Sequence, residues 1–352
     1  MGRVGYGYLR GLSLTLIAIV LAVPSLPAQT AGPLPRVMVI GTGGTIAGEQ
    51  AAPGTLSGYE IKRGVNEIVA SIPVVEQYAQ VETEQFANIP SPTITPEDWL
   101  RLANRINQLF AQRSDLAGVV VTHGTARLEE TAFFLHLTVR SDRPVVLAAA
   151  QRPATGISPD GPLNLLSAIR VAASPKARGK GAMVVMDDRI LSARDVKKLY
   201  ARSGGFDGGE MGMLGIVGSR DVEFYYAPAK THTYESDFDV SSLSSLPRVG
   251  ITYSFAGANG VADPDDAGIV VVTTGFTPEE EAYYRRLRER GVIVAATFPS
   301  GEQVSQGRGS DDGGNPGIAV QHLFPTKARI LLMLALTRTR SPGEIQRFFD
   351  SY

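Results

Sequence analysis

Apolar residues gather in short runs along this chain, and helical patterns follow the runs. Four of them, at 37–40, 118–121, 144–150 and 181–186, are apolar throughout rather than at alternate positions. Continuous apolar character is typical of strands that are covered on both faces, as in a parallel sheet flanked by helices. The first part of the chain is therefore predicted to be an α/β domain with a mostly parallel sheet.

Residues that favour helix starts stand at several places between these runs. At 95–98, Thr is the predicted N-cap and Pro takes the first helical position. A capping box at 277–280 predicts a helix to Arg290, and 341–344 repeats the device for a closing helix. Another helix is predicted over 128–135, directly after a strand and a tight turn.

A polar stretch divides the chain. Residues 227–247 are rich in Ser, Thr and Asp and lack a long apolar run, which is typical of a linker. Beyond this stretch, a second series of strand-like runs lies at 248–255, 267–273 and 292–297. We therefore predict a larger N-terminal domain over 35–226 and a smaller C-terminal α/β domain over 248–352.

The first thirty residues differ from the rest. Arg3 and Arg10 precede an apolar stretch of 12 residues, 12–23, and prolines and small residues lead from there to Ala28. A membrane span needs roughly 20 apolar residues. The pattern therefore favours a cleaved secretory signal peptide over 1–28 rather than an uncleaved anchor. We expect a periplasmic or secreted protein that does not associate with the membrane after cleavage.

Composition fits an exported globular protein without disulfides. The chain has 352 residues, 43% hydrophobic and 20% charged, so it can bury a large core. It contains no cysteine, so its stability must come from packing. Its 34 basic residues fall to 32 without Arg3 and Arg10, against 35 acidic residues, a net charge of −3. This charge gives no reason to expect nucleic acid or anionic lipid as a partner.

A glycine-rich turn follows the first strand-like run, in the sequence GTGGTIAG at 41–48. No lysine follows as in a phosphate loop, and Ile46 stands where a dinucleotide fingerprint has its third glycine. Phosphate binding is therefore not predicted, although a purely structural turn stays open. Glycines let the backbone approach a ligand closely, and open α/β sheets bind ligands at the carboxyl ends of their strands. This location makes Thr45 a candidate for chemistry.

A second run also leads into threonine, through Thr122, His123, Gly124 and Thr125. Two such strand ends could converge at one crevice. A threonine hydroxyl needs a base, and no Ser-His-Asp arrangement is evident. The four histidines, at 123, 136, 232 and 322, lack metal-ligand spacing and are interpreted as structural. Lysine is the other available base because burial lowers its pKa. No metal or cofactor is expected.

Five motifs of this chain resemble those of the bacterial type II L-asparaginases, in the asparaginase/glutaminase family. They lie at 40–48, 120–135, 143–169, 184–198 and 327–337 and span nearly the whole mature chain in order. The resemblance implies the two-domain asparaginase fold. It also implies hydrolysis of a side-chain amide through a covalent acyl-enzyme, and a homotetramer with sites between subunits.

The resemblance assigns four catalytic residues. Thr45 matches the nucleophilic threonine, and Tyr59 matches the tyrosine that closes over it on a mobile loop. Thr125 and Lys198 match the second threonine and the lysine that activates it. Structural alternatives stay open, because Tyr59 could be a surface aromatic and Lys198, beside Lys197, could lie on a solvated helix face.

The resemblance also assigns a substrate-binding set. Ser91 matches the serine that holds the α-carboxylate, although it could be a turn residue between two prolines. Gly44, Gly124 and Ala126 line the same site. Backbone N–H groups near the two threonines would stabilise an oxyanion by about 3 kcal/mol per donor.

The chain departs from the family pattern after His-Gly-Thr. The family has an aspartate there that grips the substrate α-ammonium, whereas this chain has Ala126 followed by Arg127. Burying the substrate α-ammonium without a counter-charge costs roughly several kcal/mol. The pKa of Lys198 should also be lower than in the family, because no aspartate carboxylate lies beside it. The family's asparagine-containing loop is also changed, to Thr-Gly-Phe-Thr-Pro at 274–278. Three acidic residues are candidates for a remaining ammonium contact: Glu302, Asp311 and Asp312.

The sequence thus favours a working amidohydrolase, acting on L-asparagine or a related amide. The substrate could lack a free α-amine or carry an anion that Arg127 meets. One alternative is an intact L-asparaginase with a rearranged ammonium site. The other is a catalytically silent periplasmic binding protein that kept the fold.

Overall fold

The computed structural model describes residues 1–2, 32–52, 58–301 and 317–352. The chain divides into two compact units, Met1–Pro33 and Leu34–Tyr352, and the helices and strands described below belong to the second unit. The predicted signal peptide lies almost wholly outside the described residues. Within the described residues, no helix is long and apolar enough to cross a membrane.

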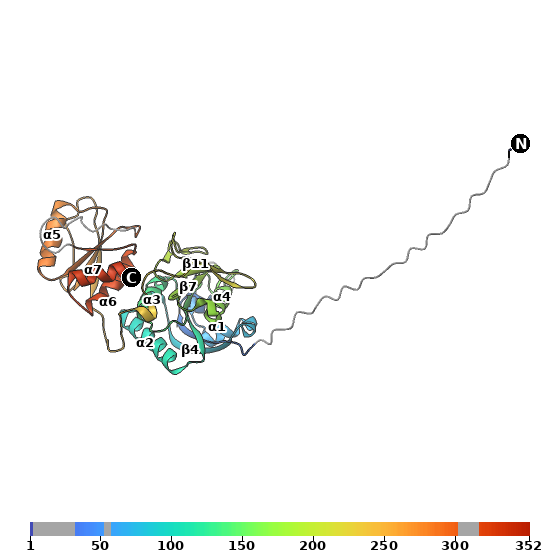
Figure 1. Ribbon diagram of the computed structural model, residues 1–352. Coiled ribbons are helices and arrows are strands. Elements are labelled where there is room, and N and C mark those ends of the chain that lie inside the picture. Colours follow the sequence, from blue (N-terminus) through green and yellow to red (C-terminus); the bar gives the residue numbers. More distant parts are fainter. Residues whose placement is uncertain (3–31, 53–57, 302–316) are drawn as a thin grey trace. The chain divides into compact units, whose positions relative to one another are not determined.

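An eight-stranded sheet forms the larger part of the fold (Figure 1). Its order is β12-β11-β8-β7-β6-β5-β1-β4, and the neighbours from β7 to β4 pair in parallel. The strands are β1 (Arg36–Gly43), β4 (Gln80–Ile89), β5 (Leu116–Thr122), β6 (Val145–Ala148), β7 (Ala182–Met186), β8 (Arg189–Ser192), β11 (Met213–Val217) and β12 (Val222–Phe224). The predicted α/β class and mostly parallel sheet are confirmed.

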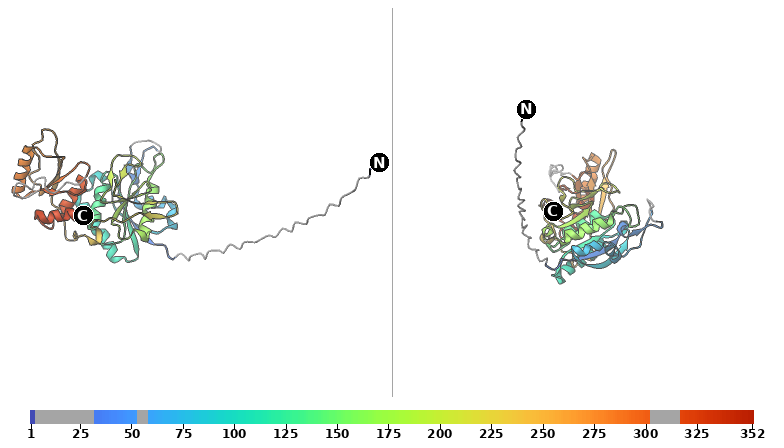
Figure 2. Two further views of the ribbon diagram at one scale, coloured as in Figure 1. Left: turned by 45° about the horizontal axis from the view of Figure 1, so that its top comes forward. Right: turned by 90° about the vertical axis from the view of Figure 1, so that its right-hand side faces the viewer.

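Successive residues of each central strand point to opposite faces of the sheet and are buried in two different hydrophobic clusters. Met38 and Ile40 of β1 pack with residues of α2 (Pro96–Gln112) and α3 (Leu128–Thr138). Val37 and Val39 pack instead with α1 (Val65–Ala70) and α4 (Gly161–Ala173). Helices therefore cover both faces of the sheet (Figure 2), which explains why these strands are apolar throughout.

The edge strand β4 was not among the predicted strands. Its sequence, QVETEQFANI, contains only exposed or partly buried residues, and it is the terminal strand of the sheet that the described residues form. Such a strand lacks the continuous apolar run that marks its neighbours.

A second, four-stranded parallel sheet has the order β13-β14-β15-β16. Its strands are β13 (Val249–Tyr253), β14 (Gly268–Val272), β15 (Ile293–Thr297) and β16 (Ile318–Ala319). α5 (Pro278–Glu289) packs on one face, whereas α6 (Pro325–Leu336) and α7 (Pro342–Ser351) pack on the other. The predicted second series of strands is confirmed.

The predicted N-cap at Thr95 and the predicted capping box at 277–280 are confirmed, and the capping box predicted at 341–344 is not. Thr95 and Thr277 each accept a hydrogen bond from the backbone three residues on. Ser341 makes no side-chain cap, so the prediction of a capping box there was wrong. Glu344 is instead engaged by the hydroxyl of Thr339, which competes for the carboxylate that a capping box would use.

The segment 227–247 contains no strand or α-helix, as its polar composition suggested. Two of its apolar residues, Phe238 and Val240, are nevertheless buried in the main core. The division of the chain into two domains at this segment remains a prediction.

Candidate active site

The two glycine-threonine turns lie side by side at the ends of neighbouring strands. β1 and β5 pair in parallel, with Gly41 opposite Thr122, so both chains leave the sheet at the same edge. Gly44 has φ +84°, and a Cβ added to it would lie 2.2 Å from the Cα of Gly124. Only glycine permits this conformation and approach. The turns that carry Thr45 and Thr125 are therefore in backbone contact.

Thr45 begins a short 3-10 helix, η1 (Thr45–Ala47), and its hydroxyl faces a tyrosine. The Oγ1 atom of Thr45 lies 2.8 Å from the hydroxyl oxygen of Tyr59. β2 (Gly48–Glu49) pairs antiparallel with β3 (Glu60–Ile61), which returns the chain to this point. Thr45 is buried, whereas Tyr59 is 44% exposed with its ring against Gly48. Tyr59 is thus exposed, yet its hydroxyl points at the candidate nucleophile.

Thr125 faces the predicted lysine. The Nζ atom of Lys198 donates a hydrogen bond of 2.7 Å to Oγ1 of Thr125. Lys198 lies in β9 (Lys197–Lys198), a two-residue strand paired with β10 (Phe206–Asp207), rather than on a helix. Burial lowers the pKa of Lys198, and the Glu129 carboxylate raises it. A lowered pKa increases the fraction of neutral amine, which is the form that accepts a proton.

A buried hydrogen-bond chain holds the turn before Thr125. His123 places Nδ1 2.8 Å from the carbonyl oxygen of Gly124, so Nδ1–H is the donor. Its Nε2 therefore accepts from the hydroxyl of Thr131, which accepts from Trp99 in turn. Burial lowers the pKa of His123 to about 4, so the ring stays neutral at pH 7. The histidine thus fixes the backbone and has no catalytic partner in this chain of bonds.

Ser91 lies against the same turn. The backbone N–H of Ala126 donates to Oγ of Ser91 at 3.1 Å, and a Cβ on Gly124 would lie 2.6 Å from that oxygen. As the acceptor of this bond, the Ser91 hydroxyl keeps its own proton for another acceptor. Ser91, Gly124 and Ala126 are thereby brought together with Gly44, as the resemblance implied.

Arg127 is turned toward a neighbouring carboxylate. Its Nη1 atom lies 3.1 Å from Oε1 of Glu130, one turn along. The suggestion that Arg127 meets a substrate anion stays a prediction. The three acidic candidates, Glu302, Asp311 and Asp312, lie outside the described residues.

Two charged residues near Lys198 were not predicted from the sequence. Glu129, in the first turn of α3, accepts the backbone N–H of Lys198 at 2.6 Å. Lys327 of α6 is fully buried and donates to the carbonyl oxygens of Arg194 (2.8 Å) and Val196. Both residues lie inside the motifs given above, but the motifs do not reveal that Glu129 contacts Lys198 and that Lys327 contacts the segment before it.

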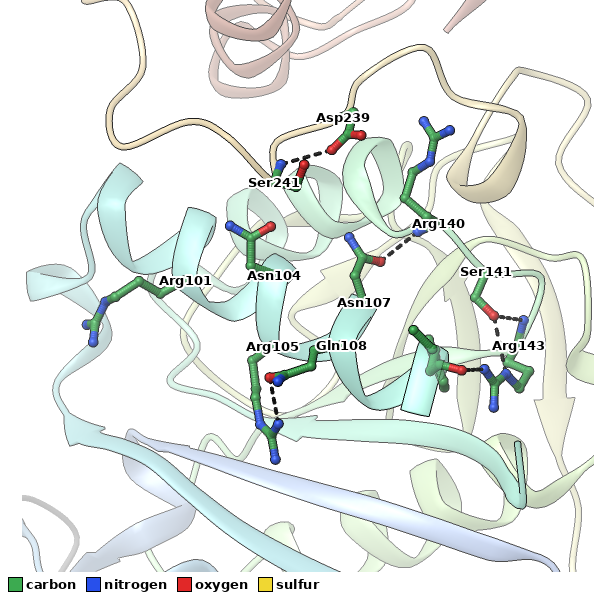
Figure 3. Close-up of a pocket in the computed structure, with 12 residues that line it drawn as sticks. Arg101, Asn104, Arg105, Asn107, Gln108, Arg140, Ser141, Arg143, Asp239 and Ser241 are labelled. Carbon is green, nitrogen blue, oxygen red and sulfur yellow. Dashed lines mark hydrogen bonds between the residues drawn. The ribbon is translucent and has the colours of Figure 1, made fainter. Parts of the chain in front are cut away.

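A separate cavity of about 850 Å³ lies over α2 (Figure 3). Its arginines already have partners: Arg105 binds Glu84, Arg140 binds the carbonyl of Ser236, and Arg143 binds the carbonyl of Arg113. Its one hydroxyl–carboxylate pair, Ser241 with Asp239, is exposed, whereas Thr45 and Thr125 are buried, so we place the chemistry with the threonines. In the described part of the chain, no group of three or more His, Cys, Asp or Glu side chains could hold a metal ion.

The arrangement fits an enzyme that attacks a carbonyl carbon with a hydroxyl group. Two hydroxyls lie on turns that are in backbone contact, and each is hydrogen-bonded to a side chain that can take up or return a proton.

Comparison with known proteins identifies the family. The family profile described as "Asparaginase, N-terminal" matches residues 36–230. "L-asparaginase 2" of Bacillus subtilis is 38% identical over 340 residues, covering 94% of this chain and 90% of that protein. "Probable L-asparaginase periplasmic" of Haemophilus influenzae is 36% identical, covering 92% and 94%. A solved structure, a probable cytoplasmic L-asparaginase from Campylobacter jejuni, matches with a TM-score of 0.83 at 38% identity, covering 90% and 100%. The chain therefore belongs to the asparaginase family.

Proposed function

We propose that this protein is an amidohydrolase that converts L-asparagine to L-aspartate and ammonia, with Thr45 as the nucleophile. One observation carries the proposal: the Thr45 and Thr125 hydroxyls lie on turns in backbone contact, and each is hydrogen-bonded to a proton-transferring group. Membership in the asparaginase family supports asparagine as the amide.

The chemistry proceeds in two steps. The Thr45 oxygen attacks the side-chain amide carbon, and its proton passes through the Tyr59 hydroxyl to the leaving nitrogen. The C–N bond breaks, ammonia leaves, and an ester joins the acyl group to Thr45. Water, deprotonated through Thr125 and neutral Lys198, then attacks the ester. The proton returns to the Thr45 oxygen, and the carboxylic acid is released.

Substrate binding follows from the groups around the turns. The Ser91 hydroxyl donates a hydrogen bond to the α-carboxylate of the substrate. Ala126 offers no counter-charge to an α-ammonium, so succinamate, which lacks that group, is expected to compete well with asparagine. Replacing Ala126 by Asp should raise kcat/KM for asparagine over that for succinamate.

We also propose that the protein is exported and forms a homotetramer. The composition of 1–28 supports export. The relatives' names point both ways, since one is called periplasmic and one structural neighbour cytoplasmic. N-terminal sequencing of protein from the periplasmic fraction and light scattering of the purified protein test the two statements.

The deciding experiment measures ammonia release from asparagine, glutamine, succinamate and a peptide with a C-terminal asparagine. Protein quenched during turnover is digested, and mass spectrometry locates the acyl ester. We expect the ester on the peptide that contains Thr45. A folded protein that releases ammonia from none of the four amides, or an ester on another residue, would refute the proposal.

A further inference from the structure

The catalytic candidate Lys198 sits on a weak local support. β9 contains only two residues, and the next two, Leu199 and Tyr200, are exposed. Holding a lysine side chain in one rotamer costs up to about 2 kcal/mol of conformational entropy. Because β9 is so short, a contact from another element can help to hold Lys198 opposite Thr125, 2.7 Å away.

Glu129 supplies that hold from the helix that follows Thr125. Its Oε2 atom accepts the Lys198 backbone N–H at 2.6 Å, and Oε1 accepts from the Thr326 hydroxyl in α6 at 3.4 Å. Thr125 stands four residues before Glu129 in the same turn-helix segment. One rigid segment thus carries the hydroxyl and also holds the lysine that contacts it.

Charged groups lie on three elements near the lysine. Glu129 faces it from α3, Lys327 lies in α6, and Asp207 lies in the partner strand β10. Arg194 and Asp195 pair with each other in the preceding segment. Among these groups, Glu129 is the one that acts on the Lys198 amine, and its charge opposes the effect of burial.

We propose that Glu129 is a positioning residue for Lys198: its carboxylate fixes the lysine backbone against Thr125 and keeps a negative charge near the amine. The inference rests on the proposed function for its catalytic consequence. Its effect on the amine itself does not depend on turnover.

The test compares two substitutions with a matched control. Glu129→Gln keeps the shape and an oxygen acceptor but removes the charge, whereas Glu129→Ala removes both. Glu130→Gln removes the next carboxylate of α3, which pairs with Arg127 and is not among the groups that shift the Lys198 pKa. Thermal unfolding verifies that each variant is folded.

The first readout is the titration of Lys198 itself. The rate of its acylation by acetic anhydride is followed against pH by peptide mass spectrometry. Because a negative charge favours the protonated amine, its midpoint should move to lower pH in Glu129→Gln and stay at the wild-type value in Glu130→Gln. An unchanged midpoint in Glu129→Gln overturns the proposal, whatever the activity.

The second readout is steady-state kinetics on asparagine. Glu129→Gln should shift the acidic limb of kcat/KM to lower pH. Glu129→Ala should lower kcat at least about tenfold with KM within a factor of two, since misplacement by an ångström can cost more. Wild-type kcat in Glu129→Ala overturns the positioning role. A wild-type protein without amidase activity, but with the Lys198 midpoint shifted in Glu129→Gln, refutes the proposed function and leaves this inference standing.

Discussion

The two threonines of the site stand in different environments. Thr45 faces a tyrosine that is 44% exposed, whereas Thr125 faces a half-buried lysine that Glu129 holds by its backbone. Burial lowers the lysine pKa, so more of the amine beside Thr125 is in the neutral form that can accept a proton. The Thr45 half relies on a direct hydroxyl contact that solvent can reach. We infer that attack belongs to Thr45 and activation of water to Thr125.

The largest effect is expected from Thr45→Val, which removes the hydroxyl and keeps the volume. Amidase kcat should fall by at least about 10³-fold, since loss of a nucleophile removes the whole covalent route. Thr42→Val is the control: it removes a buried hydroxyl that donates to the Thr122 carbonyl, so it should lower stability but keep turnover. Equal turnover in Thr45→Val and wild type would contradict the assignment.

Lys198→Met should lower kcat by about 10²–10³-fold, because the general base for the second half is lost. Lys197→Met is its matched neighbour. Lys197 Nζ lies 4.1 Å from the ring centre of Phe324, a cation–π contact worth about 1 kcal/mol of stability. The kcat of Lys197→Met should stay at the wild-type level. In the wild type, activity should fall as pH is lowered and Lys198 becomes protonated. Equal losses in both variants would argue against a specific role for Lys198.

Tyr59→Phe should reduce kcat by about 10–10²-fold, since the ring still packs on Gly48 and only the proton route is lost. Gly48→Ala tests the same contact between Tyr59 and Thr45 by displacing the tyrosine ring. A Cβ there would lie 2.5 Å from the tyrosine ring, so the ring must move away from Thr45 and kcat should fall similarly. Tyr78→Phe, which alters a ring under Arg170, serves as a control. A Tyr59→Phe variant with wild-type kcat would make Tyr59 a surface aromatic only.

The last effect concerns stability rather than turnover. Burial lowers the pKa of Lys327 to about 8 from 10.5. Between these values the unfolded chain binds more protons than the folded chain, so the free energy of unfolding should rise with pH, by up to about 3 kcal/mol. This contribution is absent below pH 8. Lys327→Met should lack the rise, and Lys180→Met, beside the Phe224 ring, should retain it. Urea unfolding at several pH values measures the difference.

The sequence alone determined the parallel sheet and the two threonine turns. Runs such as 37–40 and 118–121 are apolar on both faces, because helices cover both faces of the sheet. Glycines at 43 and 44 have positive φ, so their identity marks a backbone shape that other residues disfavour. Local conformation and burial leave a direct trace in residue type, and these features were predictable for that reason.

Only the tertiary structure decided which groups meet. Tyr59 reads as a surface aromatic and Lys198 as one of two lysines until folding brings them within 2.8 Å and 2.7 Å of their threonines. Glu129 gave no signal at all, since its partner is a backbone N–H 69 positions away. Such contacts depend on how distant segments pack, and no local pattern records the distance between two side chains that are far apart in the chain.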